Sequence, residues 1–131
     1  MKKKLLCSAT ALTILGAAVV LPVFAANPDP NASTNAYISW SQNYSNKVRG
    51  KAYASTSNPK MTKINVSGSF YQGSTLKESG TGTATSVGTE ASWYTKDGVY
   101  ADTNSYTLNA ASRTYYSGGS YDQHYASPAT W

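Results

Sequence analysis

The chain has 131 residues and a formal net charge of +5, but its first residues distort that charge. Without Lys2, Lys3 and Lys4, eight basic residues face six acidic ones, which is too small an excess for an electrostatic nucleic-acid surface. Residues 27–77 carry a balance of +5 and residues 78–131 one of −3. The only cysteine, Cys7, lies in the leading segment, so the rest of the chain forms no disulfide and no cysteine-based metal site.

Residues 1–25 have the pattern of a secretory signal peptide. Three lysines precede an uncharged apolar run that ends near Val23, and small residues follow it. Val23 and Ala25 occupy the two positions that a signal peptidase recognises, which predicts cleavage after Ala25. A retained membrane anchor is the alternative, but Pro22 and the small-residue exit argue against it. We therefore expect a secreted protein that meets a membrane only through its uncleaved signal.

The remainder is predicted to hold a flexible lead-in and one all-β domain. Residues 26–35 contain two prolines and show no periodicity, so they form the lead-in, and residues 36–131 form the domain. No later segment has the spacing of an amphipathic helix, whereas alternation is common. The first predicted strand places on one face Ile38, Trp40, Gln42 and Tyr44.

The second and third predicted strands have the clearest alternation. In the second, one face carries Val48, Gly50, Ala52 and Ala54, and the other carries Lys47, Arg49, Lys51 and Tyr53. A turn at Asn58-Pro59 follows. The third strand points inward with Ile64, Val66, Gly68 and Phe70.

The middle of the domain is predicted to be broken by glycines. Gly73 and the segment 80–82 separate short strands near residues 74–78 and 83–87. A strand at 90–96 then meets Asp97-Gly98, which is the strongest hairpin signal in the chain, and its partner starts at Val99.

The last third is predicted to be a long hairpin. A strand at about 105–116 is followed by a turn at 117–120 and a strand at 121–126, and Pro128 ends regular structure. Seven or eight short antiparallel strands at this spacing predict a β-sandwich, with an open barrel as the alternative. Aliphatic residues are scarce and tyrosines number eleven, so the core should be thin and aromatic.

Catalytic and metal chemistry finds little support in the sequence. His124 is the only histidine, and no serine has a nucleophile-elbow motif around it. A two-residue turn at Gly118-Gly119 would place His124 across from Arg113 as a surface strand residue. Glu78 and Glu90 are the only glutamates, and both lie in a polar region that favours exposure over the burial a glycosidase acid needs. We expect no enzymatic activity, no cofactor and no metal site.

Lys47, Arg49 and Lys51 recur at every second residue and therefore line one face of a strand. They form a candidate contact for an anionic envelope polymer or for membrane headgroups. Alternatively, they protect a sheet edge against pairing with another chain, which is the interpretation we prefer.

Tyr115, Tyr116 and Tyr121 form the second candidate binding surface. With Gly118-Gly119 as the turn, Tyr116 pairs with Tyr121 and Tyr115 points to the opposite face. Such rings are platforms for sugars or partner surfaces, or they replace aliphatic residues in the core and in a cross-strand ladder.

The lysine-rich signal, the cysteine-free remainder, the Trp93-Tyr94 strand, the Lys-Asp-Gly turn at 96–98 and the Tyr-rich hairpin at 115–121 resemble short exported all-β proteins of Gram-positive bacteria. The chain is also loosely similar to lactococcin-type bacteriocins, from which it differs in length. These resemblances imply an exported β-sandwich and carry over no functional residues.

Together these features predict a secreted, non-enzymatic interaction protein of the cell envelope or the extracellular space. Its partner would be an envelope polymer, a glycan or a protein. A bacteriocin-like antibacterial protein and a carbohydrate-binding module that uses surface aromatics are the alternative functions.

Overall fold

The computed structural model describes residues 29–131, so the predicted signal peptide and the start of the lead-in lie outside the described residues. The described chain is all-β and has nine strands: β1 (Ala32–Trp40), β2 (Lys47–Thr56), β3 (Met61–Gln72), β4 (Thr75–Ala84), β5 (Ala91–Tyr94), β6 (Tyr100–Ala101), β7 (Tyr106–Tyr116), β8 (Tyr121–Tyr125) and β9 (Ala129–Thr130). No helix long and apolar enough to cross a membrane occurs in this part of the chain. The predicted all-β class is confirmed.

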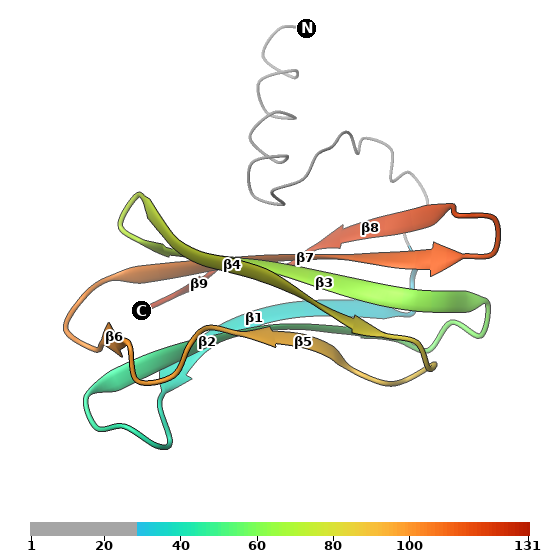
Figure 1. The fold of residues 1–131 in the computed structure, drawn as a ribbon. Coiled ribbons are helices and arrows are strands. Elements are labelled where there is room, and N and C mark those ends of the chain that lie inside the picture. The colour runs from blue at the N-terminus through green and yellow to red at the C-terminus, as the bar shows by residue number, and fades with distance from the viewer. Residues whose placement is uncertain (1–28) are drawn as a thin grey trace, which may run out of the picture.

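The strands form two facing antiparallel sheets, which confirms the predicted sandwich (Figure 1). The smaller sheet has the order β1-β2-β5, and β6 pairs with β2 as well. The larger sheet has the order β4-β3-β7-β8, and β9 pairs with β7. Figure 1 shows the smaller sheet below the larger one, with the C-terminus at the end where β6 lies.

Several strand boundaries differ from those predicted. β1 begins at Ala32, inside the predicted lead-in, and ends at Trp40, so Gln42 and Tyr44 belong to the loop that follows. β9 forms after Pro128, where regular structure was expected to end. β9 pairs with Thr107 and Leu108 of β7. This pairing explains the difference, because a partner distant in sequence stabilises a strand that is too short to show an alternating pattern of its own.

β4 runs without a break through Gly80 and Gly82, contrary to the predicted interruption. Both glycines face the smaller sheet, and Gly80 pairs with Gly68 of β3. A Cβ at Gly80 would lie 2.0 Å from Trp93 Nε1, and one at Gly68 would lie 2.5 Å from Trp93 Cε3. Gly80 therefore makes room for the Trp93 indole of the opposite sheet, and Gly82 makes room for the backbone of Ser92, and neither ends the strand.

The two halves of the core differ in composition. The alanine-rich half contains Ala52, Ala54, Met61, Ile64, Val66, Ala84, Ala91 and Ala110. The aromatic half contains Val48, Phe70, Tyr100, Tyr106 and Leu108. In the aromatic half the Phe70 ring centre lies 5.1 Å from that of Tyr106 and 4.8 Å from that of Tyr100. The expected aromatic core is thus confirmed for one half only.

Candidate functional site

β2 lies in the middle of the smaller sheet and presents cations on its outer face. Val48, Gly50 and Ala52 point inward and are buried, so Arg49 and Lys51 point outward, as the alternation predicted. β1 pairs with β2 on one side, and β5 and β6 pair with it on the other. The preferred explanation of this basic stripe, protection of a sheet edge, is therefore wrong, because both edges of β2 are already paired.

Tyrosines from the neighbouring strands flank these cations. The strand register places Tyr37 of β1 and Tyr94 of β5 on either side of Lys51. The Arg49 guanidinium lies 4.5 Å from the Tyr94 ring centre. Lys51 Nζ lies 4.6 Å from the Tyr53 ring centre and 5.3 Å from that of Tyr94. Each such contact at an exposed position contributes about 0.5–1 kcal/mol, and together they fix the orientation of both cations.

The two cations differ in how much of their charge is compensated. Lys51 Nζ lies 2.6 Å from Glu90 Oε1, and this hydrogen bond is the main cause of the raised pKa of Lys51. Arg49 donates from Nε to the Thr95 carbonyl oxygen at 3.0 Å and forms no ion pair within residues 29–131. Since a guanidinium has five N–H donors, the terminal nitrogens of Arg49 keep donors for a ligand.

A bulge shapes the surface next to Arg49. β5 and β6 both pair with β2 and follow one another along it, so the segment between them, residues 95–99, loops out of a single edge strand. The predicted hairpin at Asp97-Gly98 is therefore wrong, although Gly98 does occupy a turn with a φ of 76°. Gly50 closes the base of the bulge, donating from its N–H to Thr95 Oγ1 at 3.0 Å and accepting from the Thr95 N–H at the same distance.

The bulge is tied to the loop between β1 and β2. The Asp97 carboxylate accepts hydrogen bonds from Ser41 Oγ at 2.6 Å and from Asn43 Nδ2 at 2.8 Å. These two bonds, in that order, are the main causes of the lowered pKa of Asp97. An ionised Asp97 thus holds the two loops together at neutral pH.

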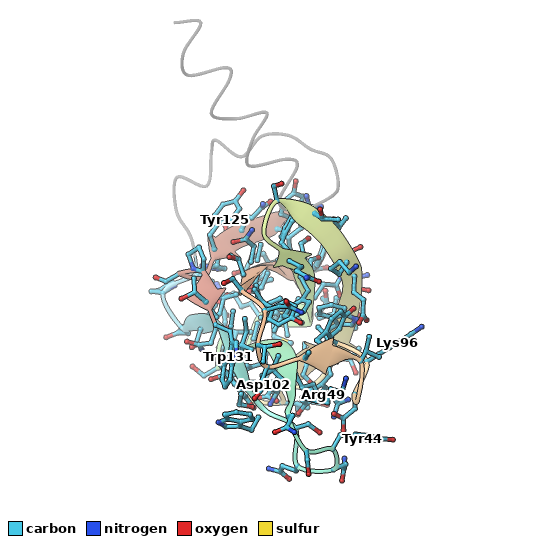
Figure 2. All side chains as sticks on the ribbon, turned by 90° about the vertical axis from the view of Figure 1, so that its left-hand side faces the viewer. Tyr44, Arg49, Lys96, Asp102, Tyr125 and Trp131 are labelled. Carbon is cyan, nitrogen blue, oxygen red and sulfur yellow. The ribbon has the colours of Figure 1, made fainter. Side chains whose placement is uncertain are left out.

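A hollow of about 230 Å³ lies between the two loops and the outer face of the sheet. It is lined by Tyr37, Ser39, Trp40, Ser41, Gln42, Asn43, Arg49, Lys51, Tyr94 and Asp97. Tyr37 and Tyr94 face outward and are 42% and 43% exposed. Trp40 is 56% exposed, but it is the register partner of the inward-facing Val48, and its indole packs edge-on against that of Trp131. Figure 2 looks onto this end of the sandwich and shows Arg49 on the same side as Lys96 and Tyr44.

The predicted tyrosine surface lies on the other sheet, and its register differs from the prediction. Tyr115, not Tyr116, pairs with Tyr121, because the turn has three residues and is closed by the Tyr116 N–H donating to the Ser120 carbonyl oxygen at 2.9 Å. Tyr116 points inward and donates its hydroxyl to Asp122 Oδ2 at 2.8 Å. Burial raises the pKa of Tyr116. Five of the six predicted site residues therefore fall on two opposite faces, Lys47, Arg49 and Lys51 on the smaller sheet and Tyr115 and Tyr121 on the larger, whereas Tyr116 lies on neither.

The two glutamates considered for catalysis have structural partners, and His124 lies apart from them on β8. His124 lies opposite Ser112, not Arg113, and burial lowers its pKa. Glu78 accepts the Tyr100 hydroxyl and the Lys96 N–H, and Glu90 pairs with Lys51. Within residues 29–131 no group of three or more His, Cys, Asp or Glu side chains is placed to hold a metal.

Sequence reasoning missed the parts of the site that come from neighbouring strands. Tyr37 and Tyr94 were not singled out, because only the strand register shows that they flank Lys51. The bulge at residues 95–99 was signalled by Asp97-Gly98 but was assigned to a hairpin.

No protein-family model matches the chain, and no curated protein sequence matches it. Among solved structures, a β-glucuronidase from Bacteroides uniformis matches with a TM-score of 0.51 and 11% identity over 77% of this chain and 14% of that one. B. uniformis β-glucuronidase 2, covalently bound to cyclophellitol-6-carboxylate aziridine, matches with a TM-score of 0.48 and 13% identity over 73% of this chain and 14% of that one. The sensor domain of the anti-sigma factor RsgI4 from Pseudobacteroides cellulosolvens matches with a TM-score of 0.39 and 10% identity over 75% of this chain and 91% of that one. The first of these shows a shared sandwich fold, and the chain spans about one seventh of that enzyme.

Proposed function

We propose that this chain is a secreted, non-enzymatic binding module that takes a glycan in the hollow of the smaller sheet. The observation that carries the proposal is the pair of exposed tyrosine rings, Tyr37 and Tyr94, on the outer face of the sheet at one hollow that also contains Arg49. Trp40 adds an exposed ring at the end of β1, where its indole contacts that of Trp131.

The lining of the hollow suits a sugar chain. Aromatic rings provide flat apolar surfaces against which the apolar face of a sugar ring packs. The amides of Gln42 and Asn43 and the guanidinium of Arg49 supply hydrogen-bonding groups beside those rings. Because Arg49 is fixed by Tyr94 and by the Thr95 carbonyl, little side-chain entropy is lost when it binds a ligand.

The same lining argues against glycoside hydrolysis at this place. A glycosidase uses a pair of carboxyl groups, one of which carries a proton. Asp97 is the only carboxylate in the lining, and its lowered pKa keeps it ionised. Asp97 therefore holds the loops of a binding site.

Removing the aromatic platforms tests the proposal. A glycan array identifies an oligosaccharide ligand, whose affinity for Tyr37→Ala and Tyr94→Ala is then measured by calorimetry. We expect each substitution to weaken binding roughly tenfold, or about 1.4 kcal/mol. Leu76→Ala removes an exposed side chain from the larger sheet and serves as the control that leaves affinity unchanged. Unchanged affinity in both tyrosine variants would remove the hollow as the binding site.

Export is tested separately on the full-length chain expressed in a bacterial host. We expect mass spectrometry of the culture medium to find a protein that begins at Ala26, because Val23 and Ala25 fit the recognition positions of a signal peptidase. A full-length chain confined to membranes would contradict the secreted part of the proposal.

A further inference from the structure

The outer face of the larger sheet repeats the arrangement of cations over tyrosine rings. Tyr115 of β7 and Tyr121 of β8 are register partners, and their ring centres lie 5.4 Å apart. Lys63 Nζ lies 4.9 Å from the centre of the Tyr115 ring. The Arg113 guanidinium lies 4.6 Å from the centre of the Tyr121 ring. Two cations and two rings thus form one continuous surface from three strands.

Carboxylates are absent from this face. The chain has six acidic residues, all within residues 29–131, and only Glu78 and Asp122 belong to strands. Both pair in register with inward-facing residues, and they accept the hydroxyl hydrogens of Tyr100 and Tyr116. The single ion pair of the described chain lies on the other sheet. The charges of Lys63 and Arg113 therefore stay uncompensated and favour an anionic ligand.

The surface also has a recess in which one cation is held in place. A hollow of about 120 Å³ is lined by Asn65, Ser67, Thr81, Ala111, Ser112, Arg113 and Tyr115. Arg113 donates from Nε to Gln123 Oε1 at 3.1 Å, and Gln123 Nε2 in turn donates to the Tyr125 hydroxyl at 2.7 Å. The remaining guanidinium donors lie beside hydroxyl and amide groups, which is a combination suited to a sugar that carries a carboxylate.

We propose that this face is a second binding surface, specific for acidic polysaccharide, and that the protein cross-links two polysaccharide chains. Figure 2 shows Tyr125 on the opposite side of the molecule from Arg49, so a chain bound at each face leaves the other face open. The second surface stands on its own observations, whereas cross-linking also rests on the proposed function of the hollow. Acidic polysaccharide fits better than a lipid surface, because the recess offers side-chain amide, hydroxyl and guanidinium groups that can hydrogen-bond the hydroxyl and carboxylate groups of a sugar.

Cross-linking is measured as the turbidity of polygalacturonate solutions mixed with the mature protein, with neutral dextran as the comparison polymer. We expect the parent protein to produce turbidity with polygalacturonate alone. The double variant Lys63→Gln/Arg113→Gln should lower the turbidity at least roughly tenfold while still binding polymer through the hollow. The control Lys60→Gln/Lys77→Gln removes two exposed charges that contact no ring and should cross-link like the parent.

The outcomes separate the two proposals. Cross-linking by Lys63→Gln/Arg113→Gln at the level of the parent would overturn the second surface. Equal turbidity with dextran would overturn its specificity. Loss of all polymer binding in that double variant, with full binding in Tyr37→Ala and Tyr94→Ala, would keep the second surface and refute the hollow.

Two further measurements test self-association and membrane binding as alternative roles of the second surface. Light scattering of the protein alone should show a monomer, and a dimer that dissociates on the Lys63 and Arg113 substitutions would overturn the proposal. Vesicles that contain phosphatidylserine should leave the parent unbound. Binding to them in preference to polygalacturonate, lost in the same double variant, would make an anionic membrane the occupant and contradict the proposal.

Discussion

The two halves of the core hold the same two sheets together in different ways. In the aromatic half, the Phe70, Tyr100 and Tyr106 rings fill the space, and each hydroxyl has a partner: Tyr106 donates to the Ala101 carbonyl oxygen at 2.8 Å and Tyr100 to Glu78. In the alanine-rich half, small side chains and glycines allow close backbone approach, and one indole, that of Trp93, covers the space.

The comparison shows that a chain with few aliphatic residues has two routes to a packed interior. Large rings contribute area but need partners for their hydroxyl groups. Small residues contribute little area each but bring the two backbones together. The aromatic half should therefore be sensitive to truncation, because a cavity follows, and the alanine-rich half to enlargement, because backbone atoms are in the way.

Truncation of Phe70 should have the largest effect. Its side chain is fully buried and contacts both Tyr100 and Tyr106, so Phe70→Ala should lower the free energy of unfolding by about 3–5 kcal/mol. Urea unfolding followed by near-ultraviolet circular dichroism measures this loss. Leu76→Ala, at a side chain that is 51% exposed, is the control and should change stability by less than about 0.5 kcal/mol. Similar losses in the two variants would mean that the aromatic half is not packed.

Enlargement of Gly82 should have the next largest effect. A Cβ there would lie 2.0 Å from the Ser92 carbonyl oxygen, which is backbone and has no side-chain freedom to move away. Gly82→Ala should therefore separate β4 from β5 and cost about 3 kcal/mol in the free energy of unfolding. Thr81→Ala, at the exposed residue next to it, is the matched control and should be nearly neutral. A neutral Gly82→Ala would show that the sheets of the alanine-rich half are not in close contact.

The same glycines show how far the fold was predictable. The inward faces of β2 and β3 were predicted correctly, because the alternation of side chains along a strand is visible in the local sequence. The glycines of β4 were misassigned because the groups that require them, the Trp93 indole at Gly80 and the Ser92 backbone at Gly82, lie on the other sheet. β9 was missed for the same reason, because its partner β7 is distant in sequence.

The candidate site was predictable only in part. The outward stripe of Arg49 and Lys51 followed from alternation, but its meaning depended on whether β2 is an edge or a central strand. The basic first half and the acidic second half of the sequence also do not become two sides of the molecule. The fold places cations outward on both sheets and carboxylates inward or in the loops and turns. Such a distribution depends on the strand register. An error of one residue in the turn at Ser117–Ser120 moves every side chain of β8 to a different partner on β7.

The smallest expected effect is a pH dependence of stability that arises beside the alanine-rich half of the core. His124 faces inward beside the alanine-rich half, where its register partner Ser112 shares a hydrogen bond of 2.6 Å with Thr34 of the opposite sheet. Burial lowers the pKa of His124, and the nearby carboxylates of Asp29 and Asp122 oppose this only in part. The Nε2 atom is buried and has no hydrogen-bond partner within residues 29–131.

A histidine whose pKa is lower in the folded state than in the unfolded state binds fewer protons when folded. The free energy of unfolding should therefore decrease as the pH falls through the unfolded pKa near 6.5, and the decrease should end below the folded pKa. Urea midpoints between about pH 5 and 8 measure it, and His124→Gln should flatten this part of the profile because it removes the titrating group. The change should be smaller than that of either core substitution. A parent protein that becomes more stable as the pH falls would instead mean that Asp29 and Asp122 outweigh desolvation, so that protonated His124 strengthens the alanine-rich half.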